Sequence, residues 1–296
     1  MKGYIITTKK KMTVILLFIL FGCLTTAFGW FEPKKLTAEQ KIEAISELSN
    51  RWLGGLQTKM PDTSAKIFFE SLLGVSLSGY RSFQTMDEVL YALRSGTVSS
   101  IWVPDLTAYW LLRNQKDLRE LKTPDPQEER FLFALALKPE KEQLRDELNK
   151  ALLELKQNGQ LNELIASYLT TGNELEPFYP EDMKVNQKQF SAKDTIYIGV
   201  TGATPPLDLL DTQDRPYGFC VAFMDEIGQI MNRKVTFVVL SNESAFSSLM
   251  SGRVDAIFCW GSGESTLDPG TIDTKRSYIT TEGYYPMRKY VFLTLN

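Results

Sequence analysis

Several polar side chains directly follow apolar segments that have the character of β-strands. Asp105 follows the residues "IWVP", and the polar segment "WGSGES" follows "DAIFC". Ligands of open α/β sheets lie outside the carboxyl ends of the strands, so these positions predict a binding site. The predicted ligand-binding residues are Thr58, Thr63, Ser64, Asp105, Trp260, Gly261, Ser262 and Ser265.

Each predicted position also has a purely structural interpretation. Thr63 and Ser64 begin a helix-like segment, where backbone amides and hydroxyls attract an anion such as a carboxylate. The same residues would equally serve as a plain helix N-cap, and so would Asp105 before "LTAYWLL". The glycine-rich residues after Trp260 would equally form a simple turn, and both interpretations stay open.

The chain contains no histidine. This absence excludes histidine acid–base catalysis, serine–histidine nucleophiles and the commonest zinc ligand. Carboxylates such as Asp105, Asp208 or Glu264 would have to act as acid or base, and no paired spacing among them demands that role. We therefore predict a protein without catalytic activity, metal or cofactor, and keep a carboxylate-dependent enzyme as the weaker alternative.

Strand-like and helix-like segments alternate along the chain. Residues 50–130 follow the order β-α-β-α-β-α, with Thr85 as the cap of one helix and Gly96 past its end. The alternation resumes over residues 195–296 and predicts parallel sheets. We therefore expect an α/β fold of two lobes, each a mainly parallel sheet flanked by helices. Such lobes place the carboxyl ends of their strands face to face across a cleft.

The first residues have the composition of an export signal. Lys9, Lys10 and Lys11 precede the apolar run "MTVILLFILFG", and no acidic residue occurs before Glu32. We predict a signal peptide over residues 1–29. Ordinary cleavage would follow Gly29, whereas "LFGC" resembles a bacterial lipobox that would leave Cys23 lipidated. The protein is then periplasmic or at the cell surface, soluble or anchored by lipid.

The charge of the chain disfavours a nucleic-acid partner. Removal of residues 1–29 removes four of the 33 basic residues and no acidic one, which leaves 29 basic against 36 acidic residues, a net charge of −7. No basic stripe is present for a phosphate backbone. Cys220 and Cys259 lie in apolar contexts, so we expect two buried thiols; a disulfide between them is the alternative.

The chain resembles the family 3 extracellular solute-binding proteins, whose type II periplasmic binding fold often captures amino acids for ABC importers. Together, the similar stretches cover most of residues 50–296. The stretches are "IGVTGATPPLDLLDTQDRPYGFCVAFMDEI", "LMSGRVDAIF", "YRSFQTMDEVLYALRSG" and "LRDELNKALLELKQNGQLNELIASYL".

The order of these stretches differs from that of the family, in which the "IGV" opening comes first and the last stretch closes the chain. We therefore predict a circular permutation, with two truncated domains in tandem as the alternative. "LKTPDPQEER" would be the only crossover between the lobes, and "YVFLTLN" would end at the hinge. The predicted parts are a signal peptide (1–29), an N-terminal helical segment (30–49), a second-lobe-like unit (50–130), a strand and helices returning to the first lobe (131–169), a linker (170–194) and a first-lobe-like unit (195–296).

The resemblance also implies roles for the site residues. In the family an acid near the position of Asp105 receives the ligand's ammonium group, and a helix start like that at Thr63 binds its carboxylate. The glycine-rich stretch after Trp260 is commonly followed by an Arg that clamps the α-carboxylate, but here no Arg occurs before Arg276. Leu207 stands where the family usually has an aromatic residue. Both departures weaken the prediction of an ordinary α-amino-acid ligand.

We predict an exported solute-binding protein that captures a small polar, amino-acid-like ligand in an interlobe cleft. Its partners would be that small molecule and the membrane subunits of an ABC importer, with membrane contact only through a lipid anchor. The alternative is a sensory or structural module of the same fold that has lost ligand binding. A thermal shift with ligand would separate these two.

Overall fold

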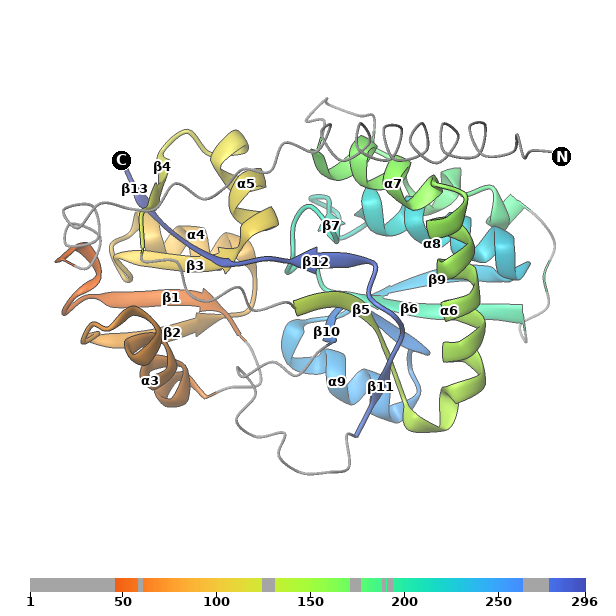
Figure 1. Cartoon of the computed structure of the whole chain (residues 1–296), viewed down its shortest axis with the longest axis horizontal. Helices are drawn as coiled ribbons and strands as arrows, with labels where there is room; N and C mark the ends of the chain where they lie inside the picture. The colour runs from red at the N-terminus through yellow and green to blue at the C-terminus, as the bar shows by residue number, and fades with distance from the viewer. Residues whose placement is uncertain are drawn as a thin grey trace, which may run out of the picture. The chain divides into compact units, whose positions relative to one another are not determined.

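A computed structural model describes residues 46–57, 61–123, 131–170, 177–187, 190, 194–262 and 277–296. All the described residues lie within one compact unit, Ala38–Asn296. That unit contains a five-stranded sheet, called sheet A here, and a six-stranded sheet, called sheet B. The predicted α/β fold with two lobes is confirmed, and lobe A and lobe B are named after their sheets (Figure 1).

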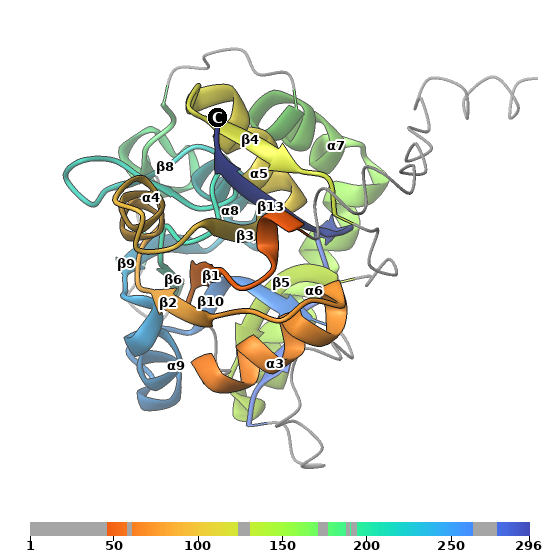
Figure 2. The same cartoon turned by 90° about the vertical axis from the view of Figure 1, so that its left-hand side faces the viewer.

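Sheet A has the strand order β2-β1-β3-β13-β4. The first three strands are parallel, and β13 runs antiparallel to both of its neighbours. Helix α3 lies on one face of the sheet, and α4 lies on the other (Figure 2). The elements are β1 (Trp52–Leu56), α3 (Asp62–Leu73), β2 (Gly79–Phe83), α4 (Met86–Arg94), β3 (Ser100–Pro104), α5 (Asp105–Asn114), β4 (Leu118–Leu121) and β13 (Tyr290–Leu295).

Local sequence signals account for the helix ends in lobe A. The Thr85 hydroxyl accepts a hydrogen bond from the Glu88 amide, and the Glu88 carboxylate accepts one from the Thr85 amide, which forms the capping box that begins α4. Gly74 ends α3 in the left-handed conformation at φ 65°, where glycine carries no steric cost. The predicted cap at Thr85 is confirmed, whereas α3 begins at Asp62, one residue before the predicted start.

Sheet B has the order β11-β5-β10-β6-β9, and β12 pairs with β5 beside this path. Strands β10, β6 and β9 are parallel, and β5 runs antiparallel to β10, so both sheets are mixed rather than mainly parallel. The strands are β5 (Phe131–Leu137), β6 (Thr195–Val200), β9 (Lys234–Val239), β10 (Ala256–Ser262), β11 (Ile279–Thr280) and β12 (Tyr285–Met287), with a separate pair of β7 (Leu209–Leu210) and β8 (Pro216–Tyr217).

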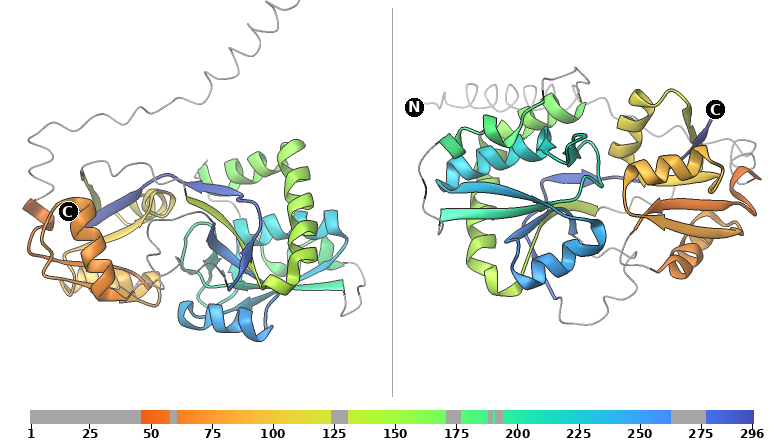
Figure 3. Two further views of the ribbon diagram at one scale, coloured as in Figure 1. Left: turned by 60° about the horizontal axis from the view of Figure 1, so that its bottom comes forward. Right: turned by 180° about the vertical axis from the view of Figure 1, so that it is seen from behind.

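Helices cover both faces of sheet B (Figure 3). The chain breaks between two consecutive helices at Gly159, which adopts φ 84° just before α7. A stripe of leucines on α6 is buried and packs toward α8. The helices are α6 (Glu142–Gln157), α7 (Gln160–Ile165), α8 (Phe219–Met231) and α9 (Asn242–Ser251); short helical turns are η1 (Pro139–Lys141), η2 (Ala166–Thr170), η3 (Pro180–Asp182) and η4 (Val185–Gln187).

Two chain segments run between the lobes, which corrects the prediction of a single crossover. One leads from β4 to β5, and the other leads from β12 in sheet B to β13 in sheet A. The prediction of a first-lobe-like unit over residues 195–296 is wrong for residues 290–295, which pair with β3 and β4 of lobe A. The chain therefore does not end at the hinge: the Asn296 amide donates to the Asp117 carbonyl at the end of lobe A.

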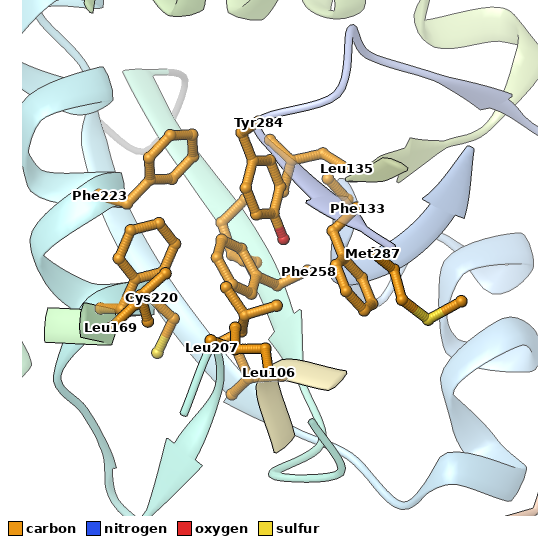
Figure 4. Close-up of a cluster of buried hydrophobic side chains, with 14 of the residues drawn as sticks. Leu106, Phe133, Leu135, Leu169, Leu207, Cys220, Phe223, Phe258, Tyr284 and Met287 are labelled. Carbon is orange, nitrogen blue, oxygen red and sulfur yellow. The ribbon is translucent and has the colours of Figure 1, made fainter. Parts of the chain in front are cut away.

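The largest apolar cluster is continuous between the lobes. Phe69 and Phe292 of lobe A belong to the same buried cluster as Phe219 and Phe258 of lobe B. Figure 4 shows the part of this cluster where Leu106, the second residue of α5, meets side chains of lobe B. The contact between the lobes at this point is therefore apolar packing.

Candidate ligand-binding site

Three polar side chains lie in a row at the carboxyl edge of sheet A. Gln84, Gln57 and Asp105 follow the neighbouring strands β2, β1 and β3, respectively. The register places Leu56 beside Phe83, and the Gln57 amide donates to the Phe83 carbonyl at 2.8 Å. The side chain of Gln84 donates from Nε2 to Oε1 of Gln57, so the two amides are joined. We call these three residues the acceptor row.

Asp105 is the first residue of α5 and not its N-cap, which is Pro104. Its amide donates to the Lys289 carbonyl at 3.1 Å, which ties α5 to the segment that crosses between the lobes. Burial raises the pKa of the Asp105 carboxyl, against smaller lowering effects from the backbone N–H groups of Leu106 and Arg288. Its Oδ1 atom is buried without a hydrogen-bond partner among the described residues.

The start of α3 is already complemented by an acidic side chain. Asp62 lies in the first turn and accepts hydrogen bonds from Ser82, at 2.6 Å from its hydroxyl and 3.3 Å from its amide. A carboxylate at a helix N-terminus already interacts with the partial positive charge of the helix dipole, which a ligand anion would otherwise do. Thr63 is exposed and Ser64 half-buried on this turn, and Thr58 lies outside the described residues.

Trp260 packs within lobe B. Its ring stacks on Phe246 with centroids 6.3 Å apart and meets Tyr278 edge-on at 5.5 Å. The backbone of Gly261 pairs with Phe133 and that of Ser262 with Leu132, so both belong to β10 rather than to a free loop. No described contact joins Trp260 to Asp105; Ser265 and Glu264 lie outside the described residues.

Asp208 fastens the loop that follows β6, a role that the sequence analysis did not predict. Its side chain is fully buried and accepts hydrogen bonds from the Thr204 amide at 2.7 Å and the Thr201 hydroxyl at 3.1 Å. Burial raises its pKa to about 6, although these hydrogen bonds favour the ionised form. Two features of the sequence could have indicated this role of Asp208: a polar residue that follows a strand, and a turn rich in hydrogen-bonding residues.

Cys220 and Cys259 are free thiols; Cys220 is buried, as predicted, whereas Cys259 is half-buried. The hydroxyl of Tyr284 lies 3.5 Å from the sulfur of Cys259, and Figure 4 shows Cys220 among the surrounding apolar side chains. Burial raises the pKa of both thiols, so neither carries thiolate character at neutral pH. They act as small apolar side chains; Cys23 lies outside the described residues.

The carboxyl ends of the strands in the two lobes face each other. Asn242, which begins α9 after β9, donates from Nδ2 to the Gln84 carbonyl at 3.2 Å. Leu207, which follows β6, is fully buried and belongs to the same cluster as Leu106 (Figure 4). A polar contact and an apolar contact therefore join the edges at which the sequence predicts a ligand.

Two surface hollows lie away from the acceptor row. One of about 290 Å³ is lined by Lys141, Arg233 and Asp255, and one of about 390 Å³ by Arg145, Asn149 and Glu282. Neither lining includes the acceptor row. Among the residues that the structure describes, no group of three or more carboxylates and thiols is placed to hold a metal ion.

Two α/β lobes that face each other at the carboxyl edges of their parallel strands define the two-lobed class of solute-binding folds. Residues 196–262 match the family model of bacterial extracellular solute-binding proteins, family 3. This match confirms, over those residues, the resemblance predicted from the sequence. None of the curated proteins matches the chain.

Several solved structures are similar to the chain. One is a Gly52Ala mutant of arginine-bound ArgBP from T. maritima, with 12% identity and a TM-score of 0.40. The similarity covers 83% of this chain and 88% of that one. YhfZ of Shigella flexneri has 13% identity and a TM-score of 0.36, covering 86% and 84%. AbpA of Streptococcus pneumoniae, an amino acid ABC transporter substrate-binding protein bound to L-arginine, has 11% identity and a TM-score of 0.38, covering 86% and 84%.

Proposed function

We propose that this protein is an exported solute-binding protein that captures a small polar, amino-acid-like ligand between its lobes and delivers it to an ABC importer. The observation that carries the proposal is the acceptor row, which lies where the strand ends of the lobes meet and contains two buried oxygens without hydrogen-bond partners among the described residues. A buried unpaired acceptor is costly, and a ligand donor would remove that cost. The family match over residues 196–262 supports the same class.

In this proposal Asp105 receives the ligand's ammonium group. Its unpartnered Oδ1 atom and its contact with the crossover at Lys289 would link ligand binding to the hinge. A ligand shifts the lobes only as far as it binds one arrangement better than the other. Trp260 would contribute an apolar wall of lobe B, whereas Thr63 and Ser64 are weaker candidates because Asp62 already occupies their helix turn.

Export rests on the segment before the folded unit. Residues 1–29 would act as a signal peptide, and lipidation of Cys23 would anchor the protein to a membrane. In the described part of the chain, no helix is long and apolar enough to cross a membrane. Labelling with radioactive palmitate, with and without Cys23→Ala, distinguishes the anchored from the unanchored form.

We also propose that the chain order is a circular permutation of the family fold. In support, β5 and β6 lie in the same sheet, and α6 packs against α8, although the proposed linker separates these elements in sequence. The family match begins only at residue 196, after the elements that resemble the family's closing helices. A chain re-cut to begin near residue 195, with the present ends joined, should fold with unchanged secondary structure by circular dichroism.

A module without ligand binding is the second candidate. The apolar packing of Leu207 against Leu106 fills the space between strand ends where a binding protein would hold its ligand. No Arg lies between Trp260 and Arg276, so the family's carboxylate clamp is missing from its expected place. Lobes held together by apolar packing need no ligand to stay closed.

The test is mass spectrometry of small molecules released from protein purified under native conditions, followed by thermal shift with each released compound. A ligand at 100 times its Kd adds about 2.7 kcal/mol to the free energy of unfolding. Asp105→Asn should abolish this gain, and Asp87→Asn should not, because Asp87 is an exposed aspartate in the first turn of α4. No released compound and no shift with amino acids, amines or sugars would favour the inert module.

A further inference from the structure

Two buried oxygens of the acceptor row lack hydrogen-bond partners. They are Oε1 of Gln84 and Oδ1 of Asp105, and no described residue donates to either. The bond from Gln84 to Gln57 orients its amide, so that Oε1 is the atom left over. Both free atoms accept hydrogen bonds, and one of them belongs to a carboxylate. The edge of lobe A therefore requires donors, and a cation at the Asp105 end.

The spacing of the row sets the size of such a ligand. Gln84 and Asp105 follow strands that are separated by β1, and neighbouring strands lie about 4.8 Å apart. The backbones that carry the two acceptors are therefore about 10 Å apart in this direction. A ligand that contacts both acceptors must be elongated, with two nitrogen donors separated by several carbon atoms.

The described edge has no comparable place for a carboxylate. The start of α3 is complemented by Asp62, which is held by Ser82. The sequence contains no basic residue from Val254 to Thr274, the stretch in which a guanidinium clamp would be expected. Two cations lie beside Asp105 on the crossover between the lobes, and both have exposed side chains: Arg288, and Lys289, which pairs with Glu120 at 3.4 Å. A ligand carboxylate would add a third negative charge to an edge that already has Asp62 and Asp105.

We propose that the ligand is an elongated amine without a carboxylate, with its ammonium group on Asp105 and a second nitrogen donor on Gln84. The proposal rests on the solute-binding function above and narrows its ligand class. A carboxylate would lie near like charge and lose its hydration without a partner. Removing the carboxylate from an otherwise equal ligand should therefore strengthen binding.

Matched pairs of compounds test this inference by isothermal titration calorimetry on the mature chain. Agmatine and putrescine are the decarboxylated forms of arginine and ornithine, and each pair keeps the same spacing between side-chain nitrogen and amine. We expect each amine to bind at least about tenfold more tightly than its amino acid, which corresponds to about 1.4 kcal/mol. Equal or tighter binding of the amino acids would overturn the inference and leave the solute-binding function intact.

The outcome in which no member of either pair binds overturns the inference as well. The released-ligand experiment then decides the solute-binding function separately, because it makes no assumption about ligand class. If arginine binds better than agmatine and Arg288→Gln abolishes that preference, Arg288 supplies the carboxylate contact and the amine assignment is wrong.

Gln84→Leu tests the second contact, because leucine keeps much of the volume and removes the acceptor. We expect it to weaken agmatine binding about tenfold. Gln143→Leu on α6 is the matched control, since Gln143 is exposed and bonds only to Glu147 among the described residues. Unchanged affinity in a folded Gln84→Leu protein would remove Gln84 from the site. Loss of folding is recognised by the melting curve, and Gln84→Glu then replaces it, with tighter agmatine binding expected.

Discussion

Asp208 should make the free energy of unfolding fall as pH rises, which is opposite to the effect of a carboxylate whose pKa is lowered by folding. Its side chain is fully buried and holds the loop after β6 through the Thr201 hydroxyl and the Thr204 amide. The titratable groups that interact electrostatically with it are the thiols of Cys220 and Cys259 and the phenol of Tyr284, none of which is charged at neutral pH. Asp208 is therefore the group in this cluster that titrates near neutrality.

The direction follows from proton binding in the two states. Burial raises the pKa of Asp208 from 3.8 to about 6, so between these values the folded protein holds a proton that the unfolded chain has released. The free energy of unfolding then falls as pH rises through this window. A shift of about two pKa units corresponds to about 3 kcal/mol over the whole window, of which about 2 kcal/mol falls between about pH 4.5 and 7.5.

The assay is urea denaturation of the wild type and Asp208→Asn at several pH values. Other carboxylates titrate equally in both proteins, so the difference between their free energies of unfolding isolates Asp208. The variant loses hydrogen bonds and should be less stable at about pH 4.5. It should regain about 2 kcal/mol relative to the wild type by about pH 7.5, because asparagine has no charge to bury.

Asp211→Asn provides the contrasting control. Backbone hydrogen bonding from Arg215 is the main effect that holds the pKa of Asp211 below its usual value. The wild type should therefore gain stability relative to this variant as pH rises from the lowered pKa to about 3.8, and the difference should stay constant from about pH 4.5 to 7.5. A difference between wild type and Asp208→Asn that stays constant from about pH 4.5 to 7.5 would refute the reasoning.

Two further predictions concern packing. Phe223→Ala should lower the free energy of unfolding by about 3–5 kcal/mol in urea, because the ring is buried against Tyr284 at 4.9 Å, whereas Tyr197→Ala at a side chain 40% exposed should cost less than about 1 kcal/mol. Gly55→Ala should cost about 1–3 kcal/mol and red-shift tryptophan fluorescence, because its Cβ would collide with the Trp102 ring. In Gly54→Ala the added Cβ would meet only side-chain atoms at 3.0 Å or more, so this variant should lose less stability than Gly55→Ala. Equal losses in the two variants would contradict the prediction.

Local sequence predicted much of the fold because short-range interactions decide helix ends. The capping box at Thr85, the left-handed Gly74 and the break at Gly159 each depend on residues within a few positions. The alternation of strands and helices likewise predicted the parallel strands of both lobes, since parallel neighbours need a crossover between them. These signals also predicted Asp105 at a strand end facing the other lobe.

Local sequence signals could not predict the position of β13. Its residues form an apolar run that fits a buried strand in either sheet, and nothing local distinguishes β3 and β4 from the strands of sheet B as its neighbours. The prediction placed it in the wrong lobe for this reason. The second crossover, through Arg288 and Lys289, follows directly from that position and could not be predicted without it.

The sequence by itself determined most of the elements, their order and the place of Asp105 directly after a strand of lobe A; it did not indicate Gln57 or Gln84 as site residues. Only the tertiary structure decided which of those residues share a surface. It joined Gln84 to Gln57 and to Asn242 of the other lobe, placed Trp260 against α9 instead, and buried Leu207 with Leu106. The physical reason is that strand pairing and lobe contact join residues far apart in the chain, so the partners of a buried oxygen depend on the whole fold.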